Sequence, residues 1–187
     1  MTTQDDPRAA LRLPDPGALP PLSDVPLLWL YARTQLRRAF GLNVTRVDEL
    51  LFVGGQFRPR QWPALHALGI RAVLSLQAER EDLFHGPQPE RALRLLVPDF
   101  YPPTVEQLRE GIAFIQAAHA DRLPVMIHCH AGVGRASLTA SAYLVACGQG
   151  WQDAFGAIRR ARPIVKLNGA QRERLEEWER LIRAERG

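Results

Sequence analysis

Residues 124–137 read PVMIHCHAGVGRAS, and this stretch decides the fold of the chain. The apolar run at 125–127 is too short for a helix and predicts a buried strand, which Pro124 opens because proline cannot donate to an interior sheet ladder. Five residues, two of them glycine, separate Cys129 from Arg135, and apolar periodicity resumes only after that arginine. The stretch therefore predicts a strand, a tight loop and a helix.

A loop that enters a helix in this way is an anion-binding site. The first turn of a helix presents backbone N–H groups without intrahelical partners and carries about half a positive charge. Two loop glycines permit positive φ and let successive amides point inward, and the arginine adds a planar fork suited to two phosphate oxygens. Positive potential at the floor of the loop favours a thiolate at Cys129, which would face a bound phosphate. The expected substrate-binding residues are His130, Ala131, Gly132, Val133, Gly134 and Arg135.

Two other interpretations of this loop are weaker. A lone cysteine usually only packs in the core, but Cys129 is followed by both glycines and the arginine at a spacing that favours catalysis. A dinucleotide-binding loop fits worse, because the third residue after Gly134 is Ser137, where that fingerprint has glycine.

The stretch HCHAGVGR, residues 128–135, resembles the signature of the cysteine-dependent protein-tyrosine and dual-specificity phosphatases: HC, five residues, then R. It is most similar to the small atypical dual-specificity phosphatases, and the resemblance extends over about residues 44–182. It implies an α/β fold, protein-tyrosine-phosphatase-like, with a mostly parallel central sheet flanked by helices. It also implies a phosphoric monoester hydrolase that dephosphorylates phosphotyrosine, and also phosphoserine and phosphothreonine, in proteins through a phosphocysteine intermediate, without metal or cofactor.

Three further residues take roles from this resemblance. Asp99 lies in VPDFYPP, residues 97–103, where three prolines stiffen a loop, and it would protonate the leaving group; alternatively it is a turn aspartate that bonds its own backbone. Gln171 matches the glutamine that positions the hydrolytic water, but Asn168 and Gln171 are also spaced as a helix-capping pair. His128 is expected to support the thiolate by a hydrogen bond to the signature loop, or else to be a satisfied core histidine.

The sequence departs from the family signature at one position. The family usually has serine or threonine directly after the arginine, where the hydroxyl donates to the sulfur and helps to expel it from the phosphoenzyme. Here Ala136 follows the arginine. Ser137 is next, but one residue along a helix turns by about 100°, so it should not substitute. We therefore expect slow hydrolysis of the phosphocysteine.

Length and composition predict one domain. The chain has 187 residues, 46% hydrophobic and 24% charged, and a formal net charge of +4. Residues 1–26 are proline-rich and predict a poorly ordered extension, and residues 27–187 predict a single phosphatase-like domain that begins with an added helix between about 26 and 41. Arginines 33, 37 and 38 could place that helix on an anionic membrane surface, but we favour packing on its own domain. With two cysteines, no visible signal peptide and no membrane-spanning run, a cytoplasmic location is expected.

Hydrophobic patterning places the remaining elements. Strands are predicted at 44–47, 50–53, 70–76 and 93–97, and helices at 62–68, 104 to before 124, 135–147, 151–161 and from 168 onward. Glycines 54 and 55 are expected to end the second strand, and residues 77–91 to form a polar surface loop. Glu79 and Arg80 in that loop resemble an ER pair of the atypical dual-specificity phosphatases, although a solvated loop explains them equally well.

Alternative functions remain open at this stage. The expected partner is a phosphorylated protein or a small phosphomonoester and not a nucleic acid, while the oligomeric state is undetermined. A lipid or inositol phosphatase would share the mechanism, although residues 130–134 lack the lysines that highly charged head groups favour. A catalytically weak phosphate-binding module would explain Ala136 but would not need Asp99. A rhodanese-like sulfurtransferase also uses a loop cysteine, but it has no use for that carboxylate.

Overall fold

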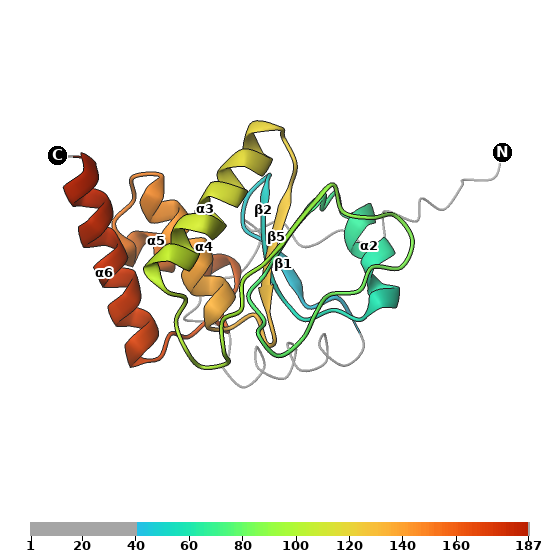
Figure 1. Ribbon diagram of the computed structural model, residues 1–187, viewed down its shortest axis with the longest axis horizontal. Helices are drawn as coiled ribbons and strands as arrows, with labels where there is room; N and C mark the ends of the chain where they lie inside the picture. Colours follow the sequence, from blue (N-terminus) through green and yellow to red (C-terminus); the bar gives the residue numbers. More distant parts are fainter. Residues whose placement is uncertain (1–40, 187) are drawn as a thin grey trace.

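The computed structural model describes residues 41–186 and is built on a five-stranded sheet of order β1-β2-β5-β3-β4 (Figure 1). The first strand pairs antiparallel with the second, and the other neighbouring pairs are parallel. The prediction of an α/β fold with a mostly parallel central sheet is confirmed. The strands are β1 (Val44–Arg46), β2 (Leu51–Gly55), β3 (Ala72–Ser75), β4 (Arg91–Arg94) and β5 (Val125–Cys129).

The helices follow the predicted order. The proline-rich extension at 1–26 and all but the last residue of the helix predicted between about 26 and 41 lie outside the described residues. The other predicted helices start within one residue of their predicted positions, and the 3₁₀ turn η3 was not predicted. The helices are the 3₁₀ turn η3 (Pro59–Gln61), α2 (Trp62–Ala67), α3 (Val105–Ala120), α4 (Arg135–Ala146), α5 (Trp151–Ala161) and α6 (Gly169–Arg186).

The sheet separates two apolar cores of different size. Helices α3 to α6 cover one face and α2 covers the other (Figure 1). The larger core includes Leu74, Ile115, Leu138 and Trp178, and the smaller one surrounds Trp62. Strand β5 contributes to both cores because successive side chains of a strand point to opposite faces.

Among the helices of residues 41–186, α4 is the most enclosed. All of its residues from Arg135 to Ala142 are buried, because it lies against the sheet and contacts α3, α5 and α6. The indole N–H of Trp178 on α6 donates to the carbonyl of Ala142 at 2.9 Å. The helix that leaves the signature loop is therefore fixed along most of its length.

Strand β2 is longer than predicted at its carboxyl end. We expected Gly54 and Gly55 to end it, but they pair in register with His128 and Cys129 of β5, so that prediction was wrong. A Cβ on Gly55 would lie 3.0 Å from the carbonyl oxygen of Ala131. Glycine is needed here because β2 runs directly beside the signature loop.

The strand predicted at 93–97 lies at Arg91–Arg94 instead. Beyond Arg94, Leu95 N still donates to Ser75 O at 2.8 Å, and Val97 N then donates to Leu95 O at 2.9 Å in a three-residue turn that bends the chain. This bend carries Asp99 over the carboxyl end of the sheet.

Candidate active site

The signature loop starts at the carboxyl end of β5, in the middle of the sheet, where open α/β sheets place ligands. Cys129 is the last residue of that strand and its side chain is buried. The backbone N–H of Gly132 donates to its sulfur over 3.3 Å. Gly132 has φ 68°, and a Cβ there would lie 2.4 Å from the carbonyl carbon of Gly54. A glycine is required at this position, and its amide faces the thiol.

Outside the loop, Arg162 holds the loop carbonyls. Its Nε donates to Gly132 O at 2.7 Å and its Nη2 to Ala131 O at 3.3 Å, while Asn43 Oδ1 and Thr45 Oγ1 accept from the same guanidinium at 2.6 and 3.0 Å. Since the carbonyls point toward Arg162, the amides of these peptides are turned to the opposite side. The loop is preorganised to receive an anion.

Arg135 begins α4 and is almost fully buried, at 1% exposure. Its Nη1 donates to Leu76 O at 3.0 Å and to Val97 O at 2.7 Å. Both of its terminal nitrogens contact the carboxylate of Glu79, at 3.0 and 2.6 Å, and Nη2 also contacts Asp99 Oδ1 at 2.8 Å. The arginine therefore joins the end of β3, the bend at Val97 and two carboxylates.

These contacts keep the arginine charged. Burial alone would lower the pKa of Arg135, but the hydrogen bond to Glu79 and the charges of Cys129 and Asp99 raise it above its ordinary value. The hydrogen bond from Arg135 lowers the pKa of Glu79 below its usual value, against a smaller opposing effect of burial. Both partners are ionised at neutral pH.

Asp99 occupies the second position of a turn in which Tyr101 N donates to Pro98 O at 3.2 Å. Its Oδ1 accepts from Phe100 N at 3.0 Å as well as from Arg135, so the local backbone bond and the contact with the signature arginine coexist. The side chain of Asp99 is 47% exposed, so its carboxylate lies beside the signature arginine with one side open to solvent.

Gln171 lies on the other side of the loop. A Cβ on Gly134 would come within 2.8 Å of its amide nitrogen and oxygen. The capping pair is present too, because Gln171 N donates to Asn168 Oδ1 at 2.9 Å and Asn168 N donates to Gln171 Oε1 at 3.2 Å. The cap engages Oε1 of Gln171, and the side-chain amide also borders the signature loop at Gly134. A helix cap and a role in positioning the hydrolytic water are therefore compatible.

We expected the two residues after Arg135 to offer no hydroxyl to the sulfur of Cys129, and the structure agrees. Ala136 is fully buried. The hydroxyl of Ser137 donates to Val133 O at 2.5 Å and to Gly134 O at 2.8 Å, back along its own helix. These bonds engage Ser137 away from the sulfur of Cys129.

His128 does not hydrogen-bond the signature loop. Its Nε2 lies 2.7 Å from Asp82 Oδ2, and its Nδ1 has no hydrogen-bond partner among the described residues. The expected bond to the signature loop is therefore corrected to one with the segment between β3 and β4. The side chain is fully buried, so it supports the strand behind Cys129.

The structure thus brings together residues from distant parts of the chain. Glu79, which the sequence left open between a family ER pair and a solvated loop, contacts Arg135. Asp82 contacts His128, and sequence reasoning missed Asp82 together with Asn43 and Arg162. Within residues 41–186, no cluster of three or more His, Cys, Asp or Glu side chains is placed to hold a metal ion.

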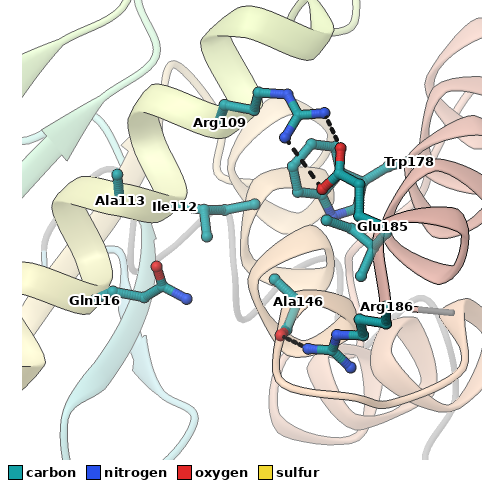
Figure 2. Close-up of a pocket in the computed structure, with 9 residues that line it drawn as sticks. Arg109, Ile112, Ala113, Gln116, Ala146, Trp178, Glu185 and Arg186 are labelled. Atoms are coloured by element: carbon teal, nitrogen blue, oxygen red, sulfur yellow. Dashed lines mark hydrogen bonds and ion pairs between the residues drawn. The ribbon is translucent and has the colours of Figure 1, made fainter.

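A separate cavity of about 270 Å³ lies between α3, the end of α4 and α6 (Figure 2). Arg109 and Glu185 pair across it, while Arg186 donates to Ala146 O. Ala146 lies at the opposite end of α4 from Arg135, so the cavity is remote from the signature loop. None of the predicted site residues lines it.

Residues 48–174 match a family described as Swiss Army Knife protein, DSP-PTPase phosphatase domain (PTP-SAK). This span contains the signature loop, Asp99 and Gln171. The chain belongs to this family. The assignment confirms the resemblance to dual-specificity phosphatases seen in the sequence.

Individual relatives agree with the DSP-PTPase assignment. Human dual specificity protein phosphatase 12 is 32% identical over 130 residues, which cover 67% of this chain and 38% of that protein. The first curated relatives are longer, and the chain spans 38% to 58% of their lengths.

Solved structures extend the agreement to the fold. The crystal structure of Tk-PTP in the active form has a TM-score of 0.67 and 27% identity, covering 74% of this chain and 97% of that one. PTPMT1 in complex with PI(5)P has a TM-score of 0.70 at 23% identity, covering 78% and 99%, and this likeness shows the fold alone.

Proposed function

We propose that this protein is a cysteine-dependent phosphatase that hydrolyses phosphotyrosine, and also phosphoserine and phosphothreonine, in proteins. The observation that carries the proposal is the arrangement of Cys129, Arg135 and Asp99. The thiol lies under an inward-facing amide at the head of α4, and the arginine that begins this helix contacts the carboxylate. Family membership and the names of the curated relatives support the same reaction class.

The proposed reaction has two steps. In the first, the Cys129 thiolate attacks phosphorus in line and an S–P bond forms while the ester P–O bond breaks. Arg135 and the loop amides stabilise the equatorial oxygens, and Asp99 gives its proton to the leaving oxygen. In the second, Gln171 orients a water, Asp99 takes a proton from it, and the S–P bond breaks to release inorganic phosphate and the thiolate.

Arg135 has to exchange partners when a substrate binds. Its two terminal nitrogens are engaged by Glu79, Asp99 and two backbone carbonyls in the ligand-free structure. A phosphate that takes a donor on Nη2 displaces the Asp99 carboxylate from the arginine. That displacement frees Asp99 to act on the leaving group.

Trapping the phosphoenzyme tests the proposal directly. The protein is mixed with excess 4-nitrophenyl phosphate in chelator-treated buffer, quenched in acid and digested. We expect one phosphoryl group on the peptide that contains Cys129. Turnover without that adduct, or a phosphoryl group on another residue, would overturn the mechanism.

A substrate panel separates the protein phosphatase from the lipid alternative. None of the five residues between Cys129 and Arg135 is a lysine, and His130 is the only one with an ionisable side chain. We therefore expect higher kcat/KM on phosphotyrosine peptides than on phosphoinositides. Preference for a phosphoinositide would favour the lipid phosphatase.

None of the helices between residues 41 and 186 has the length and apolar composition that a bilayer span requires.

The Ala136→Ser substitution is expected to speed the second step. The new hydroxyl would donate to the departing sulfur, and a hydrogen bond to a charged group corresponds to about tenfold faster steady-state turnover. Wild type should show a pre-steady-state burst of 4-nitrophenol that shrinks in the variant. The control is Ala140→Ser, the same change at another buried position one turn further along α4. The idea is wrong if no burst is seen and Ala136→Ser turns over at the wild-type rate.

A further inference from the structure

Asn168 makes hydrogen bonds in two directions. Its Oδ1 accepts from Gln171 N at 2.9 Å and so caps α6. Its Nδ2 donates to the carbonyl of Phe100 at 2.7 Å, across 68 residues of sequence. The acceptor end of this amide belongs to the helix cap, and the donor end reaches the turn that carries Asp99.

That turn has a conformation that needs external support. Phe100 has φ 66°, which is sterically unfavourable for a large side chain, and glycine or asparagine is preferred at this turn position. Phe100 is 77% exposed, so its side chain has little packing to hold the backbone. The hydrogen bond from Asn168 fixes the carbonyl of this strained residue.

The bond joins the two sides of the catalytic loop. On one side, the residue before Phe100 is Asp99, whose carboxylate lies 2.8 Å from Arg135 Nη2. On the other side, Gln171 is buried against Gly134. The side chain of Asn168 contacts both segments, so the position of the acid depends on the start of α6.

From these contacts we propose that Asn168 is a positioning residue that holds Asp99 in place for proton donation. The inference rests on the proposed function, because it assigns a role in that reaction. It gives a reason for asparagine at this cap. Serine and aspartate cap helices about as well as asparagine, but aspartate has no donor for the Phe100 carbonyl, and the only donor of the shorter serine is the capping hydroxyl itself.

This difference in donors defines the experiment. Asn168→Ser and Asn168→Asp keep a capping oxygen for α6 and remove the bond to Phe100. We measure kcat/KM, which reports steps up to the first irreversible one, on phenyl phosphate and on 2,4-dinitrophenyl phosphate. Phenolate needs a proton to leave, whereas dinitrophenolate leaves readily without one.

A displaced acid should affect only the poor leaving group. General acid catalysis contributes about 10²- to 10⁴-fold, so partial misplacement should lower kcat/KM on phenyl phosphate by about tenfold in both variants, with less than about a twofold change on the dinitrophenyl ester. Asp99→Asn should show the same selectivity with a larger loss. Adding Asn168→Ser to Asp99→Asn should lower the rate on phenyl phosphate no further, since no acid remains to be positioned.

Thr104→Ala is the matched control. Thr104 Oγ1 accepts from Gln107 N at 3.2 Å and caps α3 at the other end of the segment that follows Asp99. Its loss removes a helix cap without touching Phe100, so it should leave the leaving-group dependence unchanged.

The outcomes separate the inference from the proposed function. If Asp99→Asn shows the leaving-group selectivity but the Asn168 variants behave as wild type, or lose equally on both esters, the role of Asn168 is overturned and the phosphatase stands. The same holds if Thr104→Ala reproduces their selectivity. If Cys129→Ser keeps activity, the proposed function itself fails.

Discussion

Replacing Cys129 with serine should abolish phosphatase activity without metal, lowering kcat by at least about 10⁴-fold, the scale expected when the nucleophile of a covalent mechanism is removed. The hydroxyl of serine is far less acidic than a thiol and has no neighbouring base among its described contacts. The measurement is 4-nitrophenyl phosphate hydrolysis in chelator-treated buffer.

Cys129→Ser should lose catalysis but still bind phosphate. The Gly132 amide, the Arg162 bonds that orient the loop and the Arg135 fork all remain in Cys129→Ser. Inorganic phosphate should therefore still raise the melting temperature of the variant. This retained effect distinguishes a missing nucleophile from a collapsed loop.

The second cysteine is the matched control. Cys147 lies exposed at the far end of α4, so Cys147→Ser should keep wild-type turnover. Phosphatase activity that survives in Cys129→Ser would contradict the mechanism. Cysteine-dependent sulfur transfer from thiosulfate, without phosphatase activity, would favour the sulfurtransferase alternative.

The part of the site that could be predicted is the part that is contiguous in sequence. Cys129, Gly132 and Arg135 lie within seven residues, and the strand-to-helix transition alone determines how their backbone and side chains are arranged. Local geometry was sufficient there, as it was for the helix predicted from residue 104, which begins with a capping box between Thr104 and Gln107.

The parts that could not be predicted depend on distant pairs. Asn43 and Arg162 meet around Ala131 although 119 residues separate them, and nothing in either local pattern indicates that contact. Gly54 and Gly55 suggested a break because glycine weakens strands. Only the approach of the signature loop explains why they continue one.

Glu79 shows how a polar pattern can mislead. A charged segment with two prolines and a glycine is typical of a solvent-exposed loop, and much of residues 79–90 is exposed. Yet the loop leaves the carboxyl end of β3, next to β5, so its first residues must pass the start of α4. The carboxylate at the beginning of the loop therefore reaches Arg135 while its later residues remain in solvent.

Arg135→Lys is expected to have the second largest effect, lowering kcat/KM by about 10³-fold because the guanidinium donors to the developing phosphoryl charge are lost. Lysine keeps the positive charge, but one ammonium nitrogen cannot reproduce the planar fork. The inhibition constant for vanadate, which is expected to bind in the signature loop as phosphate does, should rise in parallel.

Arg135 also joins Leu76 O, Val97 O and Glu79, so its removal perturbs structure as well as binding. Arg94→Lys separates these effects. Arg94 donates to the carbonyls of Gln77 and Ala78 at 2.9 and 3.0 Å, in the same segment after β3. Neither of these hydrogen bonds involves the signature loop. It should therefore lose stability and keep kcat/KM within about twofold, as expected for a residue outside the chemistry. An equal loss of kcat/KM in Arg94→Lys would show that the effect at Arg135 comes from a loosened segment and not from the missing fork.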